Sequence, residues 1–205
     1  MNVEVITATE NPIDVISVAA GICYGKDKDD VSEKRIRHCF RANHLSVAEH
    51  ANITFRIEGI SRACMAQLTR HRHASFCVES QRFCKYDFIG DDWFVIPPSL
   101  GEEGSLINHF FFLMEQCSKA YRHALVDGVK PEDARYLLPE ATKTNLEMTC
   151  NLRELFHIFD MRLDKAAQWE IRELAAKMKE QAGAVNEQWE FVIGLYGIWN
   201  EQERA

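Results

Sequence analysis

The chain has 205 residues, of which 46% are hydrophobic and 27% are charged, and its formal net charge is −7 at pH 7. This balance is typical of soluble globular proteins, and the acidic total argues against broad, non-specific binding to nucleic acid. No stretch approaches the ~18 uninterrupted apolar residues of a transmembrane helix. The N-terminus also lacks the basic start and apolar core of a signal peptide. We therefore expect a single cytoplasmic domain over residues 1–205 with no membrane partner.

Strand and helix patterns follow one another in the first half of the chain. Asn11-Pro12 combines an N-cap with a first-turn proline, and the strict polar–apolar alternation of residues 52–58 is typical of a half-buried strand. In chain order we expect a strand at 3–8, a helix from 11 to 24 that stops at Gly25, a helix at 31–42, a strand at 52–58, a helix from Ser61 to Thr69 and an extended segment at 76–86.

The second half is mainly helical in pattern. Asn151 is a good N-cap, and alternation over residues 145–150 predicts a strand with Leu146, Met148 and Cys150 facing inward. We expect a long helix at 104–126 closed by Gly128, a short helix between Pro131 and Pro139, a strand at 145–150, a helix at 151–163, and one or two further helices. Because strands and helices do not alternate as a βαβ series, the fold class is α+β, with an antiparallel sheet flanked by helices and a helical C-terminal part.

A basic segment stands out against the acidic background. Residues 61–85 carry five cationic side chains and one acidic one, Glu79. Arginine forks match phosphate oxygens in pairs, so such a cluster indicates an anionic ligand. Three other readings stay open here: a solvated loop paired with acidic neighbours, a non-catalytic nucleotide-binding protein, and an RNA-binding protein that stacks bases on Phe76 and Phe83.

A second arginine lies on an apolar helix face. In the helix after Asn151, the stripe of Leu155, Ile158 and Phe159 continues one turn later at Arg162. A guanidinium on an inward face needs a polar or anionic partner, although an arginine near a helix end can also extend to solvent. Two separated segments that both direct arginines inward favour a buried anion site.

Metal and thiol chemistry are not expected. The histidines and glutamate of segment 44–50 match no H-E-x-x-H helix and have no fourth ligand. Ser46 and Glu49 are instead spaced as a capping box. The seven cysteines contain no C-x-x-C pair, so we expect neither structural zinc nor a disulfide framework and interpret most of them as small core residues.

Taken together, these motifs resemble the flavin-dependent thymidylate synthases, whose signature is R-H-R, seven residues and then S. The corresponding positions are Arg70-His71-Arg72 and Ser80. The resemblance covers about residues 40–90 and 130–175 and includes His44-x-Ser46-x-x-Glu49-His50, Gln67, Ala134-Arg135-x-x-Leu138-Pro139, Asn151-x-Arg153, His157, Arg162 and Gln168-Trp169-Glu170. Members often have Asn-Glu inside the signature, where this chain has Cys77-Val78 and then Glu79.

The resemblance implies reductive methylation of dUMP to dTMP. Methylenetetrahydrofolate would supply the carbon and FAD, reduced by NADPH, the hydride, in a homotetramer whose sites lie at subunit interfaces. By position, Arg162 would be catalytic because it would stabilise the N3-deprotonated uracil ring. The FAD ligands would be Ser46, Arg70, His71, Arg72, Asn151, Arg153 and His157. The dUMP ligands would be Gln67, Arg70, Glu79, Ser80, Arg82, Arg135 and Arg162.

Overall fold

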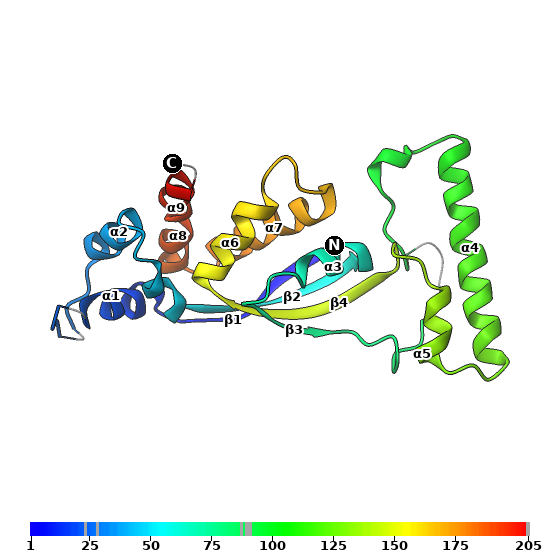
Figure 1. The fold of residues 1–205 in the computed structure, drawn as a ribbon, viewed down its shortest axis with the longest axis horizontal. Helices are drawn as coiled ribbons and strands as arrows, with labels where there is room; N and C mark the ends of the chain where they lie inside the picture. Colours follow the sequence, from blue (N-terminus) through cyan, green and yellow to red (C-terminus); the bar gives the residue numbers. More distant parts are fainter. Residues whose placement is uncertain (23, 28, 87, 89–91, 204–205) are drawn as a thin grey trace. The chain divides into compact units, whose positions relative to one another are not determined.

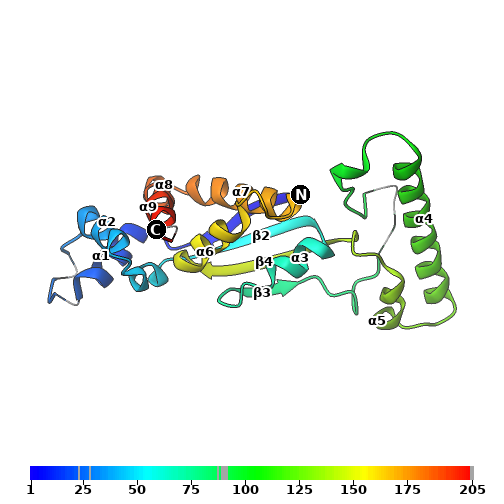
Figure 2. The same cartoon turned by 45° about the horizontal axis from the view of Figure 1, so that its top comes forward.

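The computed structural model of the chain describes residues 1–22, 24–27, 29–86, 88 and 92–203 (Figures 1 and 2). The elements in chain order are β1 (Asn2–Ala8), α1 (Pro12–Ile22), α2 (Glu33–Arg41), η1 (Leu45–His50), β2 (Asn52–Ser61), α3 (Arg62–Leu68), β3 (Ser75–Val78), η2 (Pro98–Leu100), α4 (Ser105–Val126), α5 (Pro131–Ala134), η3 (Arg135–Leu137), β4 (Lys143–Asn151), α6 (Leu152–Arg162), α7 (Trp169–Gly183), α8 (Glu187–Gly194) and α9 (Tyr196–Glu203), where η denotes a 3-10 helix.

Contacts group these elements into two compact units. Unit 1 comprises Met1–Ile57, Gln67–Cys77 and Glu147–Ala205, and unit 2 comprises Glu58–Ala66 and Val78–Leu146. The expected single domain over residues 1–205 stays a prediction.

The strands form one antiparallel sheet in the order β1-β2-β4-β3. The register is visible between β2 and β4, where Thr54 hydrogen-bonds Thr149 and Arg56 pairs with Glu147 further back along β4. The strand alternation is confirmed, because the odd-numbered apolar residues of β2 and the even-numbered residues of β4 are buried: Ile53, Phe55, Ile57, Leu146, Met148 and Cys150. The predicted α+β class with an antiparallel sheet flanked by helices is therefore confirmed.

In unit 1, α6 and α7 lie on one face of the sheet, and α7 packs on β1 (Figures 1 and 2). The predicted apolar stripe of α6 forms the centre of this layer, with Leu155, Ile158 and Phe159 fully buried. The Asn151 cap is confirmed, because its Oδ1 accepts the backbone N–H of Glu154 at 2.9 Å. The helices α1, α2, α8 and α9 pack against one another in the same unit.

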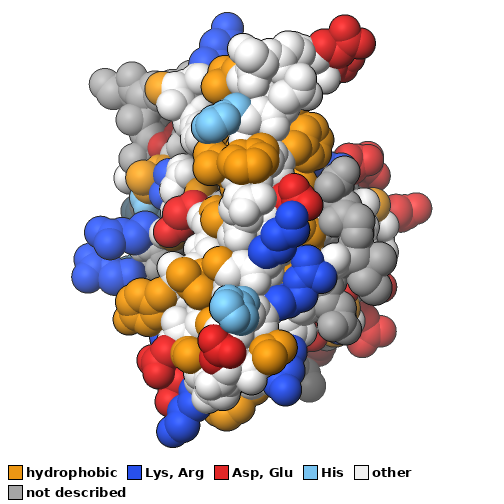
Figure 3. All heavy atoms as spheres, turned by 90° about the vertical axis from the view of Figure 1, so that its right-hand side faces the viewer, with side chains coloured by type: hydrophobic (Ala, Val, Ile, Leu, Met, Phe, Trp, Pro, Cys, Tyr) orange, Lys and Arg blue, Asp and Glu red, His pale blue; other side chains and the backbone are white. Residues whose placement is uncertain are grey.

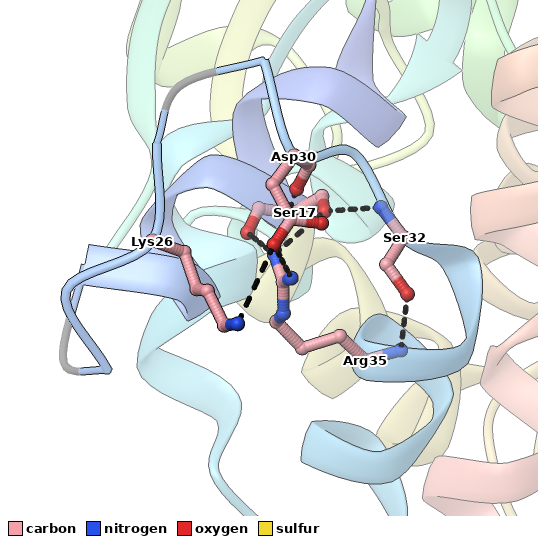
Figure 4. A network of polar contacts seen from close by, with 5 residues as sticks. All are labelled: Ser17, Lys26, Asp30, Ser32 and Arg35. Carbon is pink, nitrogen blue, oxygen red and sulfur yellow. Dashed lines mark hydrogen bonds and ion pairs between the residues drawn. The ribbon is translucent and has the colours of Figure 1, made fainter.

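A polar network holds the connection between α1 and α2 (Figure 4). The Arg35 guanidinium donates to the Asp30 carbonyl at 2.9 Å and pairs with the Asp30 carboxylate at 2.9 Å. It also donates to the carbonyl of buried Ser17 at 3.2 Å. The Ser17 hydroxyl accepts the N–H of Ser32 at 2.7 Å, and the Ser32 hydroxyl caps α2 by accepting the N–H of Arg35. One partly buried arginine side chain therefore fixes this loop and the start of α2.

Unit 2 has its own aromatic core beside the long helix α4. Trp93, Phe94 and Met114 are buried there, and the ring of Phe88 meets those of Trp93 and Tyr121 edge to face, a favourable aromatic geometry. The outer face of α4 mixes apolar side chains with cationic, acidic and histidine side chains (Figure 3). Large apolar residues exposed on α4 are Leu106, Phe112, Leu113 and Val126.

Several element predictions were wrong in detail. The extended segment expected at 76–86 is a strand only as far as Val78. After the ladder bond from Glu79 N–H to the Asn145 carbonyl, the Ser80 carbonyl accepts the N–H groups of Phe83 and Cys84 and turns the chain. The helix after Ser61 ends at Leu68, one residue early, and its cap is confirmed by the bond from Cys64 N–H to Ser61 Oγ at 3.0 Å.

The capping box at segment 44–50 was also wrong. That segment is the 3-10 helix η1, which begins after His44 without a side-chain cap, and the Glu49 carboxylate is paired with Arg153 instead. After α6 the described part of the chain holds three helices, α7, α8 and α9, one more than expected. None of the helices in the described residues is both long and apolar enough to cross a membrane.

Candidate functional site

The basic motif and the end of α6 meet in unit 1. Arg162, half-buried in the last turn of α6, donates from Nε to His71 Nε2 at 3.0 Å and from Nη2 to the Gln67 carbonyl at 3.2 Å. These two acceptors are uncharged, and together they orient the guanidinium. The structure therefore brings together three of the residues that the sequence selected.

A buried carboxylate lies on the other side of the His71 ring. Glu154 Oε1 is 3.5 Å from His71 Nδ1, and both side chains are nearly inaccessible, at 6% and 2% exposed. Burial, followed by the nearby charges of Arg162 and His157, lowers the pKa of His71 to about 4. Burial also raises the pKa of Glu154. Because His71 is neutral at physiological pH, its Nε2 lone pair is free to accept from Arg162.

A pocket of about 440 Å³ opens beside this group in unit 1. Three predicted FAD ligands line it: Asn151, Arg153 and His157. The same wall includes Glu49, His73 and Glu154, and the apolar part comes from Leu45 and Trp199. His157 also stacks edge to face on His71, with ring centroids 5.6 Å apart. The pocket thus combines hydrogen-bond donors with an aromatic and an aliphatic surface.

This donor set fits a flavin dinucleotide. A guanidinium, two imidazoles and an amide suit phosphate and sugar oxygens, and the apolar wall suits a flat ring system. The Trp199 indole is 5% exposed, and its Nε1 finds no hydrogen-bond partner among the residues that the structure describes. Buried donors are normally satisfied, and Trp199 is also one of the residues that line this pocket.

The remaining predicted FAD ligands lie differently. Ser46 is exposed on η1 and lines a separate hollow of about 360 Å³, together with His44 and His50. Arg70 and Arg72 are exposed on either side of buried His71. Within unit 1 the structure thus gathers part of the set in one pocket and leaves Ser46 outside it.

In unit 2, Glu79 is held by a polar network around the start of β4. The Asn145 amide donates to Glu79 Oε2 at 2.8 Å while Asn145 Oδ1 accepts the Gly59 N–H at 3.0 Å. The Glu79 carbonyl accepts from the Arg62 guanidinium at 3.0 Å, and Arg62 also contacts the Tyr86 hydroxyl. The carboxylate is thus oriented by a residue that the sequence analysis did not select.

Two other predicted dUMP ligands of unit 2, Arg82 and Arg135, contact Glu132. Arg82 is exposed and pairs with the Glu132 carboxylate at 3.2 Å, while Arg135 donates to the Glu132 carbonyl at 3.0 Å. The Ser80 hydroxyl accepts the backbone N–H of Arg82 at 3.3 Å. These side chains are therefore engaged with one another or with the local backbone.

The described cysteines differ in burial. Cys39, Cys64 and Cys150 are buried, as expected of core residues, whereas Cys77 and Cys84 are exposed; Cys23 lies outside the described residues. Burial raises the pKa of the Cys150 thiol, which favours the inert thiol form. No cluster of three or more histidine, cysteine or acidic side chains within the described residues is placed to hold a metal ion.

Sequence reasoning missed Glu154 and Trp199. A signal for Glu154 was present, because it lies one turn before Ile158 on α6 and so adjoins the apolar stripe. An acidic residue beside a buried stripe requires a partner in the core. Trp199 carried no comparable signal, since one more aromatic residue in a C-terminal helix is ordinary core composition.

Comparison with known proteins gives the family. Residues 4–186 match the family described as thymidylate synthase complementing protein. A flavin-dependent thymidylate synthase of Pyrococcus furiosus is 40% identical over 88% of this chain and 78% of its own length. One from Geobacter sulfurreducens is 40% identical over 87% of this chain and 80% of its own length.

Solved structures show the same fold. A UMP/dUMP methylase, PolB, from Streptomyces cacaoi bound with 5-Br dUMP superposes with a TM-score of 0.79 at 24% identity, covering 96% of each chain. The flavin-dependent thymidylate synthase ThyX of Helicobacter pylori, complexed with FAD and dUMP, gives 0.76 at 23% identity, covering 94% of this chain and 98% of that one. With the sequence relatives, this confirms the predicted resemblance: the chain belongs to the flavin-dependent thymidylate synthase family.

Proposed function

We propose that the protein is a flavin-dependent thymidylate synthase that converts dUMP to dTMP by reductive methylation, with methylenetetrahydrofolate as carbon donor and NADPH as reductant. Family membership supports the reaction. The observation that carries the residue assignment is the contact between Arg162 and His71, because it joins the two separated arginine motifs of the sequence in one group. A non-catalytic nucleotide-binding or RNA-binding protein is the rival function.

The cofactor is FAD, which supplies hydride transfer chemistry when bound. The residues of this chain would bind and orient it. Asn151, Arg153 and His157 would donate to its oxygens from the pocket of unit 1, with Trp199 beside them. Ser46, Arg70, His71 and Arg72 complete the proposed FAD set.

Arg162 is the proposed catalytic residue. The C5 atom of uracil is a poor nucleophile until negative charge enters the ring, and a guanidinium at the base edge stabilises the N3-deprotonated form. The contacts to His71 and Gln67 fix the direction of this guanidinium before substrate arrives. A pre-oriented charge needs no reorganisation during the reaction, which is why such groups are effective.

The other proposed dUMP ligands are Gln67, Arg70, Glu79, Ser80, Arg82 and Arg135. Ser80 is assigned to the phosphate and not to a covalent step, because its hydroxyl accepts from Arg82 N–H and has no neighbouring base in the sequence. Arg82 and Arg135 would bind phosphate after a rearrangement of their present contacts with Glu132. A cytoplasmic location also remains part of this proposal.

The assembly is proposed to be a homotetramer in which chains share sites. A mixture of inactive Arg70→Ala and inactive Arg162→Ala subunits should regain some activity after subunit exchange if the two residues act in one site from different chains. A catalytically competent monomer by light scattering would contradict shared sites.

Absorbance and turnover test the function. The purified protein should show visible flavin absorbance or take up FAD, and should oxidise NADPH faster when dUMP is present and form dTMP with methylenetetrahydrofolate. A colourless protein that FAD cannot reconstitute would support a rival function.

A further inference from the structure

The side chains of Glu154, His71 and Arg162 form a row in space within unit 1. His71 is at the centre, with Nδ1 facing the Glu154 carboxylate and Nε2 accepting from Arg162 Nε–H. The two ends come from opposite ends of α6, since Glu154 lies in its first turn and Arg162 in its last. His71 comes from the basic motif, so the arrangement links that motif to both ends of one helix.

The Arg162 contact determines the protonation of the ring. A guanidinium Nε–H can only donate, so Nε2 must carry a lone pair and not a proton. A neutral imidazole then carries its proton on Nδ1, on the side of Glu154. In a doubly protonated ring, the His71 Nε2–H would face the Arg162 Nε–H. Two donors would then oppose each other, and the contact would break.

Glu154 is placed to select this tautomer. At 3.5 Å its carboxylate is at the outer limit of a hydrogen bond, but it is the acceptor that faces Nδ1 in a poorly solvated site, where charge interactions are strong. The helix N-terminus at Glu154, capped by Asn151, favours a negative charge at this position. The Glu154 side chain is only 6% exposed. Its carboxylate therefore has a desolvation cost that a solvent-exposed glutamate in the first turn of a helix would not have.

We propose that Glu154 is a positioning residue that fixes His71 as the Nδ1–H tautomer, so that His71 Nε2 holds the Arg162 guanidinium in its catalytic orientation. The inference extends the proposed function, on which its catalytic consequence rests. Glu154 acts through His71 and Arg162 and need not touch substrate. Removal of the carboxylate lets the proton move to Nε2, where it faces Arg162 and displaces the guanidinium.

Two readouts test this proposal. Magic-angle-spinning NMR of ¹⁵N-histidine-labelled, FAD-loaded protein reports which ring nitrogen of His71 carries the proton, with the His71→Asn variant assigning the signal. Solvent exchange of the dUMP C5 hydrogen with the reduced enzyme reports activation of the uracil ring. The variants are Glu154→Leu, which removes the acceptor, and Glu154→Gln, which keeps an oxygen acceptor. The matched control is Glu173→Leu, which removes an exposed glutamate of α7 that pairs with Lys177.

In the wild type His71 should be neutral with its proton on Nδ1 at pH 7. Glu154→Leu should move the proton to Nε2 and slow C5 exchange by about ten- to hundredfold, as expected for loss of a charge-assisted contact. Glu154→Gln should keep the tautomer and exchange within about threefold of wild type, and Glu173→Leu should match wild type. Circular dichroism and flavin absorbance should be unchanged in all three.

Different results would contradict the positioning role of Glu154 and the proposed function. A wild-type His71 that is protonated on Nε2 at pH 7, or Glu154→Leu protein that exchanges at the wild-type rate, would overturn the positioning role. Should Glu154→Leu not fold, the smaller Glu154→Ala replaces it, and misfolding of both would make Glu154 a structural residue and also overturn the role. A wild-type protein that neither exchanges C5 hydrogen nor forms dTMP would instead contradict the proposed function, while the tautomer measurement stands by itself.

Discussion

Each of the two units holds a group of arginines, and the two groups are held in different ways. In unit 1, Arg162 is half-buried and is oriented by the neutral acceptors His71 Nε2 and the Gln67 carbonyl. In unit 2, Arg82 is exposed and is paired with the Glu132 carboxylate. The Arg162 contacts with His71 and Gln67 are partly buried and fix the direction of the guanidinium, whereas an exposed ion pair is weak and easily exchanged for another anion. In the proposed function, this difference matches a catalytic role for Arg162 and a binding role for Arg82.

The largest expected effect separates these two arginines. Arg162→Ala should lower the rate of dTMP formation by about a hundredfold or more, because an electrostatic contact in the transition state is lost. Arg82→Ala should instead raise KM for dUMP by about tenfold with a smaller change in kcat, as expected of a phosphate contact of about 1.4 kcal/mol. Steady-state kinetics of both flavin-loaded variants measures the contrast, and equal kcat losses would remove it.

A second prediction uses acidification to probe unit 1. The pKa of His71 is about 4 in the folded protein but about 6.5 when unfolded, so the unfolded chain binds the proton first as the pH falls. His71 therefore contributes stability above pH 6.5 that is lost as the pH falls toward 4. Glu154 has the opposite effect on the pH dependence of stability. Because its pKa is raised by burial, it contributes stability at low pH that is lost as the pH rises.

Denaturant unfolding at pH 6.5 and pH 5 gives the measurement. The wild type should lose about 1.6 kcal/mol more unfolding free energy across this interval than His71→Gln, whose side chain does not titrate. Equal losses in the two proteins would show that His71 is not held neutral in the fold.

A smaller effect is expected at Arg35, a third arginine whose surroundings are structural. Its contacts with Asp30 and Ser17 hold the loop before α2 (Figure 4). Arg35→Ala should lower the unfolding free energy by about 1–2 kcal/mol through loss of partly buried charged hydrogen bonds. FAD binding and C5 exchange should be unchanged in the folded variant, and a specific loss of exchange would place Arg35 in the site.

The smallest effects are expected at the exposed thiols. Cys77→Ser and Cys84→Ser should each leave dTMP formation within about an order of magnitude of wild type, because neither residue has a metal or redox partner in its sequence spacing and the flavin carries the electrons. Turnover assays of the flavin-loaded variants measure this. Complete loss of activity in a folded variant would assign a thiol to the reaction.

Much of the fold could be predicted because its signals are local. The alternation that buries Ile53 and Phe55, the Asn151 cap and the apolar stripe of α6 depend on neighbouring residues alone. The extended segment after Val78 was wrong because the Ser80 carbonyl turns the chain through backbone bonds, which leave no pattern in side-chain polarity.

The candidate site was predictable in its motifs but not in its contacts. Arg162 was selected because a cation continues an apolar stripe, and the structure gives it a polar partner in His71. The pairing of His71 with Glu154, which lies 83 positions further along the chain, depends on tertiary packing and could not be inferred from spacing. For the same reason the orientation of Glu79 by Asn145 was missed.

The most direct test of the account is exchange of the dUMP C5 hydrogen with solvent, measured with reduced enzyme and saturating dUMP. This step reports charge entering the uracil ring separately from NADPH oxidation and carbon transfer. The wild type should exchange the hydrogen, and Arg162→Ala, with its secondary structure and FAD retained, should exchange it about a hundredfold more slowly. Exchange at the wild-type rate in Arg162→Ala would make Arg162 a structural residue and contradict the assignment.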